Sequence, residues 1–470
     1  MNDIMPPRLR QILMETPALD RAYLVGGCVR DWLLGAPVKD FDVEVFGVDY
    51  DSLIRALSRW GRADLVGRSF GVLKLTVLPG ETYDFSLSRR DSKTGTGHRG
   101  FAIQLDPSIT PQEAASRRDF TINAMMFDLR RSQLLDFYGG ESDLKARQLR
   151  HTSPAFREDP LRVLRGMQFA ARFQLQATPE TLQICREMTK TFPELAVERV
   201  REEWFKWAAR SLRPSLGLRF LFETGWLEHF PELSATVGVL QEAEWHPEGD
   251  VWVHTNHCVD ALVDLPQWKA ADETSQIILT LAVLLHDIGK ARTTVQEIRR
   301  GQMRLVSPLH EVVSGDLAEA FLLRIGSFET VNRRVLPLVL NHMAQYDEPT
   351  TRAIRRLSSR LQPATVQELV TVMTADASGR PPMPREIPEN VRAILQRAQE
   401  LELESQAPKP ILMGRHLLES GMKPGPKMGQ IVQNAFEAQL EGKFQDLVGA
   451  LDWLKSHLLK EAHPLGANKT

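Results

Sequence analysis

Carboxylates at alternate positions of one short segment are the first feature of the sequence that could do chemistry. Asp40, Asp42 and Glu44 belong to the run DFDVEV, whose other positions are apolar. This alternation predicts a strand on which the three carboxylates share one face. Carboxylates two residues apart on such a face can jointly bind hard divalent cations, which can activate an attacking oxygen and neutralise a leaving pyrophosphate. A solvated edge strand is the alternative interpretation.

A glycine pair precedes these carboxylates, between an apolar run and a helical segment. The apolar residues 22–25 predict a short buried strand, and VRDWLLG predicts a short helix. Gly26 and Gly27 allow the backbone to approach a ligand and to turn successive N–H groups toward an anion near the helix N-terminus. This order of elements predicts a site for a nucleoside triphosphate and two metal ions, whereas each element alone is more often a plain turn or strand.

Arginine stands beside a carboxylate in a second segment, SRRDFTINAMMFD, at residues 116–128. A guanidinium group binds phosphate through paired hydrogen bonds, and a neighbouring carboxylate can hold it in place. Arg118 followed by Asp119 therefore predicts a triphosphate contact that is stabilised by a local ion pair. A basic pair on the protein surface is the alternative.

Both segments resemble one family of enzymes. GGCVRD followed by KDFD resembles the nucleotidyltransferase motif of the DNA polymerase beta superfamily, and RRDFTINAM resembles a second motif of the bacterial class II tRNA nucleotidyltransferases. These are the CCA-adding enzymes, to which the poly(A) polymerases are related. The resemblance implies that Asp40 and Asp42 are catalytic and hold Mg²⁺. The implied nucleotide contacts are Gly26, Gly27, Arg30 and Arg118 for the triphosphate, with Asp119 and Asn123 near the sugar.

A third segment, EDPLRVLR, resembles the motif that selects the base in this family. The apolar pattern from Pro160 predicts a helix, with Asp159 as its N-cap and Pro160 at its first position. Asp159 and Arg162 share a helix side, and a carboxylate can accept from an exocyclic amine while a guanidinium donates to a ring acceptor. Because cytosine and adenine both present an amine beside a ring nitrogen, this pair could accept CTP and ATP. Arg165 would add a phosphate or base contact, and helix capping alone would also explain Asp159.

A second centre is indicated by histidines in the C-terminal half. LAVLLHDIGK places a His-Asp doublet at the end of an apolar helix, and this resembles the HD phosphohydrolase domain. Residue-by-residue matching implies the metal ligands His254, His286, Asp287 and Asp376. His310 and His342 could hold a second metal ion or a phosphate. The ligand types admit zinc, manganese, nickel or magnesium, and a structural or vestigial metal site is the alternative to phosphoester hydrolysis.

Two further features bear on the first site. Asp84, in the strand-like run TYDFSLS, could supply a third metal carboxylate or be a surface residue. Residues 89–100, RRDSKTGTGHRG, have the composition of a mobile loop, and the resembling family has a flexible loop there that is linked to the terminal adenosine addition. An ordinary hairpin connection is the alternative.

Length and composition constrain the domain organisation. A chain of 470 residues with 43% apolar and 25% charged residues predicts a soluble globular protein of two to four domains. The expected fold class is α+β: a polymerase-beta-like head with a small mixed sheet at 1–150, an all-α neck and body at 151–245, an HD domain at 246–380 and a helical, tRNA-contacting C-terminal unit at 381–470. Three widely spaced cysteines suit a reducing cytoplasm, no segment suits a membrane span, and a net charge of −2 requires any RNA-binding charge to be local.

The resemblance implies template-independent addition of C, C and A from CTP and ATP to the tRNA 3′ end, with release of pyrophosphate. One alternative is an A-adding enzyme or poly(A) polymerase of the same family. A second alternative makes HD hydrolysis the main activity, and a third is a non-catalytic RNA-binding protein, against which the carboxylates of both centres argue.

Overall fold

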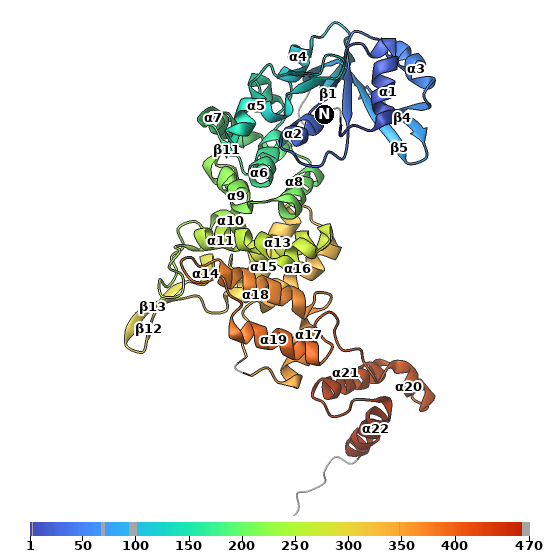
Figure 1. The fold of residues 1–470 in the computed structure, drawn as a ribbon. Coiled ribbons are helices and arrows are strands. Elements are labelled where there is room, and N and C mark those ends of the chain that lie inside the picture. Colours follow the sequence, from blue (N-terminus) through green and yellow to red (C-terminus); the bar gives the residue numbers. More distant parts are fainter. Residues whose placement is uncertain (2, 67–70, 94–100, 347, 463–470) are drawn as a thin grey trace, which may run out of the picture. The chain divides into compact units, whose positions relative to one another are not determined.

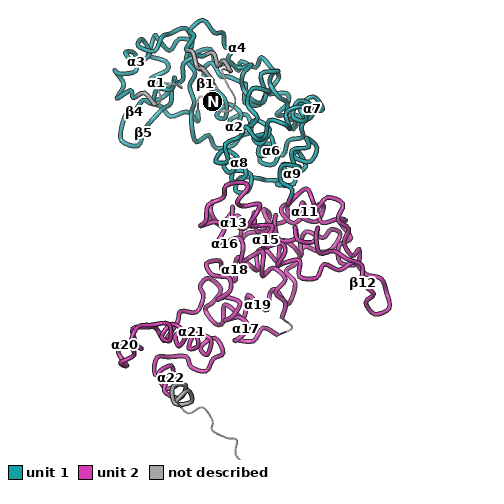
Figure 2. The backbone as a smooth tube through the Cα atoms, turned by 180° about the vertical axis from the view of Figure 1, so that it is seen from behind, with its two compact units in different colours: residues 1–231 teal, residues 232–470 magenta. Residues whose placement is uncertain are grey.

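The computed structural model describes residues 1, 3–66, 71–93, 101–346 and 348–462. The chain divides into two compact units, Met1–Pro231 and Glu232–Thr470 (Figure 2). No helix in the described part of the chain is long and apolar enough to cross a membrane. The division of the chain into four parts at 150, 245 and 380 stays a prediction.

The first unit begins with a head built on one mixed sheet (Figure 1). Its strands, in spatial order, are β3 (Arg62–Val66), β4 (Val72–Leu78), β5 (Glu81–Leu87), β2 (Asp42–Val45), β1 (Ala22–Val25), β8 (Met126–Asp128) and β9 (Gln133–Leu135). Only β2 and β5 run parallel, and the other pairs are antiparallel. The helices of the head are α1 (Pro7–Glu15), α2 (Gly27–Leu33), α3 (Tyr50–Ser58), α4 (Pro111–Ser116) and α5 (Gly140–Lys145), with 3₁₀ turns at Pro17–Leu19 and Thr121–Asn123. The mixed sheet and the α+β class are therefore confirmed.

The register of the sheet brings carboxylates from two strands together. Asp42 is the Cα partner of Asp84 across the parallel pair β2–β5. The prediction that Asp40 lies on the same strand is wrong, because β2 begins at Asp42. The neighbouring strand β1 ends at Val25, and Gly26 turns the chain away with φ 71°, so on this side β2 has no β1 partner before Asp42.

The segment expected to be a loop at 89–100 is partly a strand. Strands β6 (Arg89–Lys93) and β7 (Phe101–Leu105) form an antiparallel pair. The prediction of a loop is wrong for residues 89–93, and residues 94–100 lie outside the described part of the chain.

The rest of the first unit is helical apart from the two-residue strands β10 (Gln148–Leu149) and β11 (Gln176–Ala177). Its elements are α6 (Leu161–Phe173), α7 (Pro179–Glu187), α8 (Val197–Arg210) and α9 (Pro214–Glu223), with 3₁₀ turns at Pro154–Glu158, Thr189–Glu194 and Trp226–His229. Helices α8 and α9 pack on α6, around the fully buried Trp204, Trp207 and Trp226. Burial of several large aromatic side chains stabilises this packing.

The N-cap of α6 differs from the prediction by one residue. The helix begins at Leu161 and Pro160 occupies the N-cap, so the predicted placing of Asp159 as N-cap is wrong. Asp159 still satisfies a free donor of the first turn, because its Oδ1 accepts from the Leu161 N–H at 3.0 Å. The fixed φ of proline is compatible with a helix start.

The second unit is helical around one β-hairpin. Its elements are α10 (Pro231–Ser234), α11 (Val251–Asp264), α12 (Pro266–Ala270), α13 (Glu273–Leu285), α14 (Lys290–Thr293), β12 (Val295–Arg299), β13 (Gln302–Val306), α15 (His310–Arg324), α16 (Glu329–Asn341), α17 (Thr351–Leu361), α18 (Val366–Ser378), α19 (Glu389–Glu400), α20 (Gly414–Glu419), α21 (Pro426–Leu440) and α22 (Leu447–Ala462). Helix α13 is buried on all sides from Ile277 onward, and it packs against α11, α16 and α18. A helix that is apolar all round belongs in a core. The ends of these four helices carry His254, His286, Asp287, His342 and Asp376 of the second centre, and the start of α15 carries His310.

Candidate nucleotide and metal sites

Asp42 and Asp84, with Asp40 nearby, form the acidic end of the site in the head. Asp42 and Asp84 are cross-strand partners. Partial desolvation raises the pKa of Asp42, and the negative charges of Asp84 and Asp40 raise it further, whereas Arg118 opposes the shift. Carboxylates that repel one another in this way can be stabilised together by a divalent cation.

Arg118 is held by a partner different from the expected one. Its Nη2 donates to Glu44 Oε2 at 3.0 Å. Glu44, a buried residue of β2, therefore forms the ion pair with Arg118 that was expected from Asp119. Gly26 makes room for this guanidinium, since a Cβ at position 26 would lie 2.9 Å from Arg118 Nη1. The positive φ at Gly26 and this close approach both require glycine.

Asp119 binds a different arginine, on helix α6. Arg165 donates to Asp119 Oδ2 at 2.7 Å, and Asn123 Nδ2 donates to Oδ1 at 3.0 Å. Burial alone would raise the pKa of Asp119, but the Arg165 guanidinium and these hydrogen bonds lower it below its ordinary value. Arg30 from α2 in turn donates to Asn123 Oδ1, and its guanidinium lies 4.3 Å from the centre of the Phe173 ring. These contacts connect α2, the segment before β8 and α6.

Asp159 and Arg162 are joined through the main chain, where the Arg162 N–H donates to the Asp159 carbonyl at 3.1 Å, but their side chains have different partners. The two guanidinium ends of Arg162 donate to the carbonyl oxygens of Ala155 and Arg117, at 2.8 and 2.6 Å. Asp159 Oδ2 instead faces Arg199 of α8 at 3.4 Å. The two side chains therefore have separate long-range supports, on α8 for Asp159 and on the segments before α6 for Arg162.

All the predicted nucleotide contacts line one pocket of about 420 Å³. Its lining residues are Gly26, Gly27, Arg30, Asp42, Arg118, Asp119, Asn123, Asp159, Arg162, Arg165, Phe169 and Arg199. Five arginines against three aspartates make this pocket suitable for a polyanion. Sequence reasoning missed Arg199 and Phe169, and the only signal for Arg199 was the basic side of the amphipathic run VERVREEW.

The second centre brings together the four predicted HD ligands. His254 Nε2 lies 3.1 Å from Asp376 Oδ1 and 3.6 Å from Asp287 Oδ2. His286 Nε2 lies 3.3 Å from Asp287 Oδ2 and 3.9 Å from Asp376 Oδ1. All four residues are buried or nearly so, and they come from α11, the end of α13 and α18.

The other oxygen of Asp287 faces two more histidines. His310 Nε2 lies 3.1 Å from Asp287 Oδ1, His342 Nε2 lies 3.6 Å from it, and the two nitrogens are 3.2 Å apart. Asp287 thus stands between two groups of donor atoms. Burial opposes the charged form of Asp287, yet nearby His286 and Lys290 hold its pKa well below the ordinary value.

The orientation of the histidines fits a bound cation. Nδ1 of His286, His310 and His342 each lies 2.7 to 2.9 Å from a main-chain carbonyl three residues earlier, which leaves Nε2 directed at the centre. Nε2 of His286 is buried and makes no hydrogen bond among the described residues. It lies 3.3 Å from Asp287 Oδ2 without an aligned hydrogen bond, and metal coordination would satisfy it. Cys258, which sequence reasoning did not include, places Sγ 3.3 Å from His254 Nε2.

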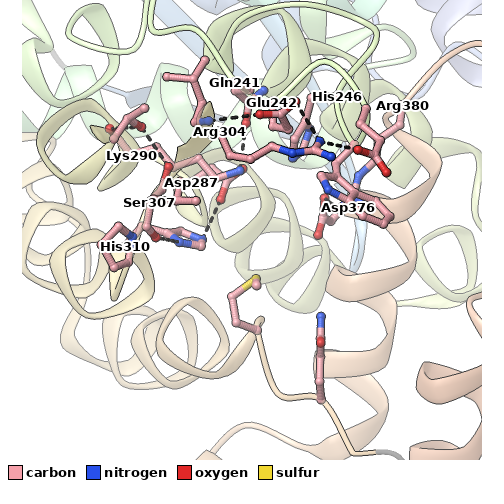
Figure 3. A pocket seen from close by; sticks show the side chains of 18 of the residues that line it. Gln241, Glu242, His246, Asp287, Lys290, Arg304, Ser307, His310, Asp376 and Arg380 are labelled. Carbon is pink, nitrogen blue, oxygen red and sulfur yellow. Dashed lines mark hydrogen bonds and ion pairs between the residues drawn. The ribbon is translucent and has the colours of Figure 1, made fainter. Parts of the chain in front are cut away.

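A large cavity opens over this centre. It measures about 1010 Å³, and its wall includes strands β12 and β13 and the start of α19. Asp287, Lys290 and His310 line one side, and Asp376 with Arg380 lines the other (Figure 3). Lys290 forms an ion pair with Asp287 at 2.6 Å, and Arg380 forms one with Asp376 at 2.7 Å. Each of these two basic side chains therefore lies beside a predicted metal ligand.

Models of known protein families match the head and the part of the chain that carries the second centre. Residues 22–150 match the poly A polymerase head domain, and residues 256–380 match the HD domain, so His254 lies just before the second match. Fold and sites together define a nucleotidyltransferase that carries an HD domain. The match with an HD domain and the groups of histidines and carboxylates are typical of proteins that use divalent metal ions.

Named relatives identify the family. The multifunctional CCA protein of Neisseria meningitidis serogroup A is 35% identical over 378 residues, which are 77% of this chain and 83% of the relative. That of Xanthomonas campestris pv. campestris (strain B100) is 41% identical over 298 residues, 62% of this chain and 69% of the relative. The chain therefore belongs to the bacterial class II CCA-adding enzymes with an HD domain.

Solved structures share the fold over nearly the whole length. The Bacillus stearothermophilus CCA-adding enzyme, solved in complex with CTP, covers 98% of this chain and 100% of its own, with a TM-score of 0.62 and 19% identity. The Thermotoga maritima CCA-adding enzyme, solved with tRNA, covers 97% of each chain, with a TM-score of 0.57 and 17% identity. At this identity the likeness concerns the fold.

Proposed function

We propose that this protein adds C, C and A to the 3′ end of tRNA from CTP and ATP, releasing pyrophosphate, with no nucleic-acid template. The observation that carries the proposal is the single head pocket. It combines a carboxylate of the DFD motif, phosphate-binding arginines and the Asp159/Arg162 motif. Relatives solved with CTP, ATP or tRNA support the choice of substrates.

In this proposal Asp40 and Asp42 hold Mg²⁺, and Asp84 is placed to assist. Bound there, Mg²⁺ would supply positive charge that neutralises the triphosphate and the leaving pyrophosphate. Arg118, anchored on Glu44, and Arg30 bind phosphate oxygens beside the glycines at 26 and 27.

Asp159 and Arg162 select the base. Each oxygen of a carboxylate can accept more than one hydrogen bond, so Asp159 can accept an exocyclic amine while it stays bound to Leu161 and Arg199. Arg162 has five N–H donors, and those not used on main-chain carbonyls can reach a ring nitrogen. Arg165 serves mainly through Asp119, which it orients near the sugar together with Asn123.

The decisive experiment offers the protein tRNA that lacks CCA, with each nucleotide separately and in combination. We expect addition of two cytidines from CTP and of one adenosine after them from ATP, and no extension with GTP or UTP. The double variant Asp40→Ala, Asp42→Ala should lose all addition. Long A tails on any RNA, or addition of adenosine alone, would favour a different member of the family.

For the second centre we propose a divalent transition metal held by His254, His286, Asp287 and Asp376, with His310 and His342 available to a second ion or a phosphate. The buried Nε2 of His286, which faces two carboxylates but makes no hydrogen bond among the described residues, supports this fit. A metal ion there would supply Lewis acidity toward a phosphoester, while Lys290 and Arg380 place positive charge at the cavity wall. The protein would act in the cytoplasm. The basic residues Lys423 and Lys427, which flank the start of α21, would contact tRNA in the C-terminal unit.

A further inference from the structure

A buried glutamate, outside every motif noted in the sequence, stands behind the second centre. The side chain of Glu248 has no exposed surface, and its Oε1 lies 2.7 Å from His254 Nδ1 and 2.9 Å from His246 Nδ1. Both distances are those of hydrogen bonds that imidazole N–H groups donate to a carboxylate. One oxygen therefore holds two imidazole rings, whose centres are 4.7 Å apart.

The loop that carries Glu248 is held in place by contacts that do not involve the histidines. Asp250, two residues later, is the N-cap of α11, and its Oδ1 accepts from the Val253 N–H at 2.8 Å. Its Oδ2 accepts from the Gly238 N–H at 2.7 Å. The loop that carries Glu248 is thus anchored at the start of the helix that carries His254.

His254 differs from the other three histidines of the centre in its support. Nδ1 of His286, His310 and His342 lies against a main-chain carbonyl, whereas Nδ1 of His254 lies against the Glu248 carboxylate. In every case Nε2 is the nitrogen left to face the centre. A carboxylate behind a ligating imidazole fixes the tautomer and ring orientation and raises the basicity of the ligand more than a neutral carbonyl does.

The charge of Glu248 also fits this arrangement. Asp287 pairs with Lys290 and Asp376 pairs with Arg380. Among the described residues the ion pairs of Glu248 are with histidines alone. A buried carboxylate is costly unless positive charge lies near it, and a metal ion on the far side of His254 would supply such charge.

A metal site made of His246, Glu248 and His254 themselves is the competing interpretation of the cluster. Two atoms bound tetrahedrally to one ion at about 2.1 Å each are about 3.4 Å apart. The observed distances of 2.7 and 2.9 Å are shorter and match direct hydrogen bonds. The ring nitrogens that face Glu248 are therefore donors to it.

We propose that Glu248 is a positioning residue of the HD centre, which presents Nε2 of His254 to the metal ion by accepting its Nδ1–H. The inference rests on the metal centre proposed above. His246, held by the same oxygen, lines the substrate cavity beside Arg380 (Figure 3). Glu248 therefore connects a metal ligand with the cavity wall.

Titration of the full-length protein with Co²⁺ tests the inference, in a background in which Asp40→Ala and Asp42→Ala remove the head site. Calorimetry and Co²⁺ absorption give the dissociation constant and the coordination. We expect Glu248→Gln, which keeps the size of the side chain, to weaken Co²⁺ binding about 10- to 100-fold. Glu232→Gln is the matched control, because it removes another buried carboxylate of the second unit, bound to Arg324, and should leave Co²⁺ affinity within about twofold.

Further measurements separate positioning from a merely structural role. Nitrogen NMR of the Zn²⁺-bound protein should find the proton of His254 on Nδ1, and Glu248→Asp should recover part of the affinity. Co²⁺ affinity of Glu248→Gln within twofold of the parent protein would overturn this inference alone. A parent protein that binds no Co²⁺ would overturn the proposed metal centre together with it, and retained CCA addition by Glu248→Gln in the native head would show that this failure is confined to the second centre.

Discussion

At the scale of single residues, the head site depends on side chains that hold other side chains. Arg118 is anchored by Glu44, Asp159 faces Arg199, and the carboxylate of Asp119 is bound by Arg165. Arginine has many rotamers, so an anchored guanidinium loses less conformational entropy when it binds phosphate than a free one. The supporting residues should therefore affect nucleotide affinity without touching the nucleotide.

Replacing Glu44 tests this anchoring. In Glu44→Gln the charged hydrogen bond to Arg118 becomes a neutral one, at a cost of about 1.5 kcal/mol. We expect KM for both CTP and ATP to rise about tenfold, measured by nucleotide incorporation into tRNA. Asp64→Asn on exposed β3 is the control. An unchanged KM for both nucleotides would mean that Arg118 needs no anchor.

Replacing Asp159 tests the selection of the base. In Asp159→Asn the side chain gains N–H donors, which can bind the carbonyl groups of uracil and guanine. We expect the preference for CTP over UTP, as the ratio of kcat/KM values, to fall at least tenfold. Glu158→Gln, one residue earlier, should keep the preference. Unchanged rejection of UTP by Asp159→Asn would assign selection to other groups.

At the scale of elements, α6 is the part of the first unit that joins helices to the head. Arg165 on α6 binds Asp119, which lies just before the Thr121–Asn123 turn and β8. Arg30 on α2 packs its guanidinium on the rings of Phe169 and Phe173 of the same helix. The ion pair and these cation–π contacts hold α6 against α2 and against the segment before the Thr121–Asn123 turn, which carry the proposed phosphate contacts Arg30 and Arg118.

The Asp119–Arg165 pair should make stability depend on pH in a defined direction. Because the folded-state pKa of Asp119 is lowered, its contribution is present above the unfolded-state pKa of about 3.9 and is lost as pH falls through the folded-state value. At pH 7, Asp119→Asn should therefore unfold about 3 kcal/mol more easily, and this difference should shrink below about pH 4. Urea unfolding followed by tryptophan fluorescence measures it.

Asp51→Asn, on the exposed side of α3, is the control for that experiment. It should unfold like the parent protein at each pH. A difference between Asp119→Asn and the parent protein that stayed constant from pH 7 to pH 3 would contradict the assignment of the low pKa to Asp119.

At the scale of the whole molecule, two compact units carry the two centres separately. The nucleotide pocket is lined from the first unit and the HD cavity from the second. Each unit has its own buried core, in which the head sheet and α6–α9 contribute to one and α11, α13, α16 and α18 contribute to the other. CCA addition and the phosphoester chemistry proposed for the HD centre should consequently be separable by substitution.

We expect His286→Ala to lower phosphoester hydrolysis at least 100-fold while CCA addition stays within twofold, and Asp42→Ala to do the reverse. The reason is that each variant removes a metal ligand from one centre only. Hydrolysis of a chromogenic phosphodiester and incorporation into tRNA are the two measurements. Chelation by EDTA should abolish both, and loss of both activities in either single variant would contradict independent centres.

Much of the local structure was predictable, because periodicity and breakers are properties of neighbouring residues. The strand at 22–25 and the helix after Gly26 follow from such patterns. The strands of the sheet and their ends were harder to predict, since β3 was not expected and β2 begins later than the run DFDVEV suggests. Strand ends depend on which neighbour is available for hydrogen bonding, which no local pattern contains.

The sequence by itself determined the motifs: the glycine pair, the alternating carboxylates, RRDFTINAM and HDIGK, each a short run whose residue types and spacing carry its chemistry. Only the tertiary structure decided the partners: Glu44 for Arg118, Arg165 for Asp119, Arg199 for Asp159 and Glu248 for His254. The physical reason is that a long-range ion pair forms where packing brings two side chains from different elements within reach. That distance is set by the register of strands and the packing of helices, which short sequence patterns do not encode.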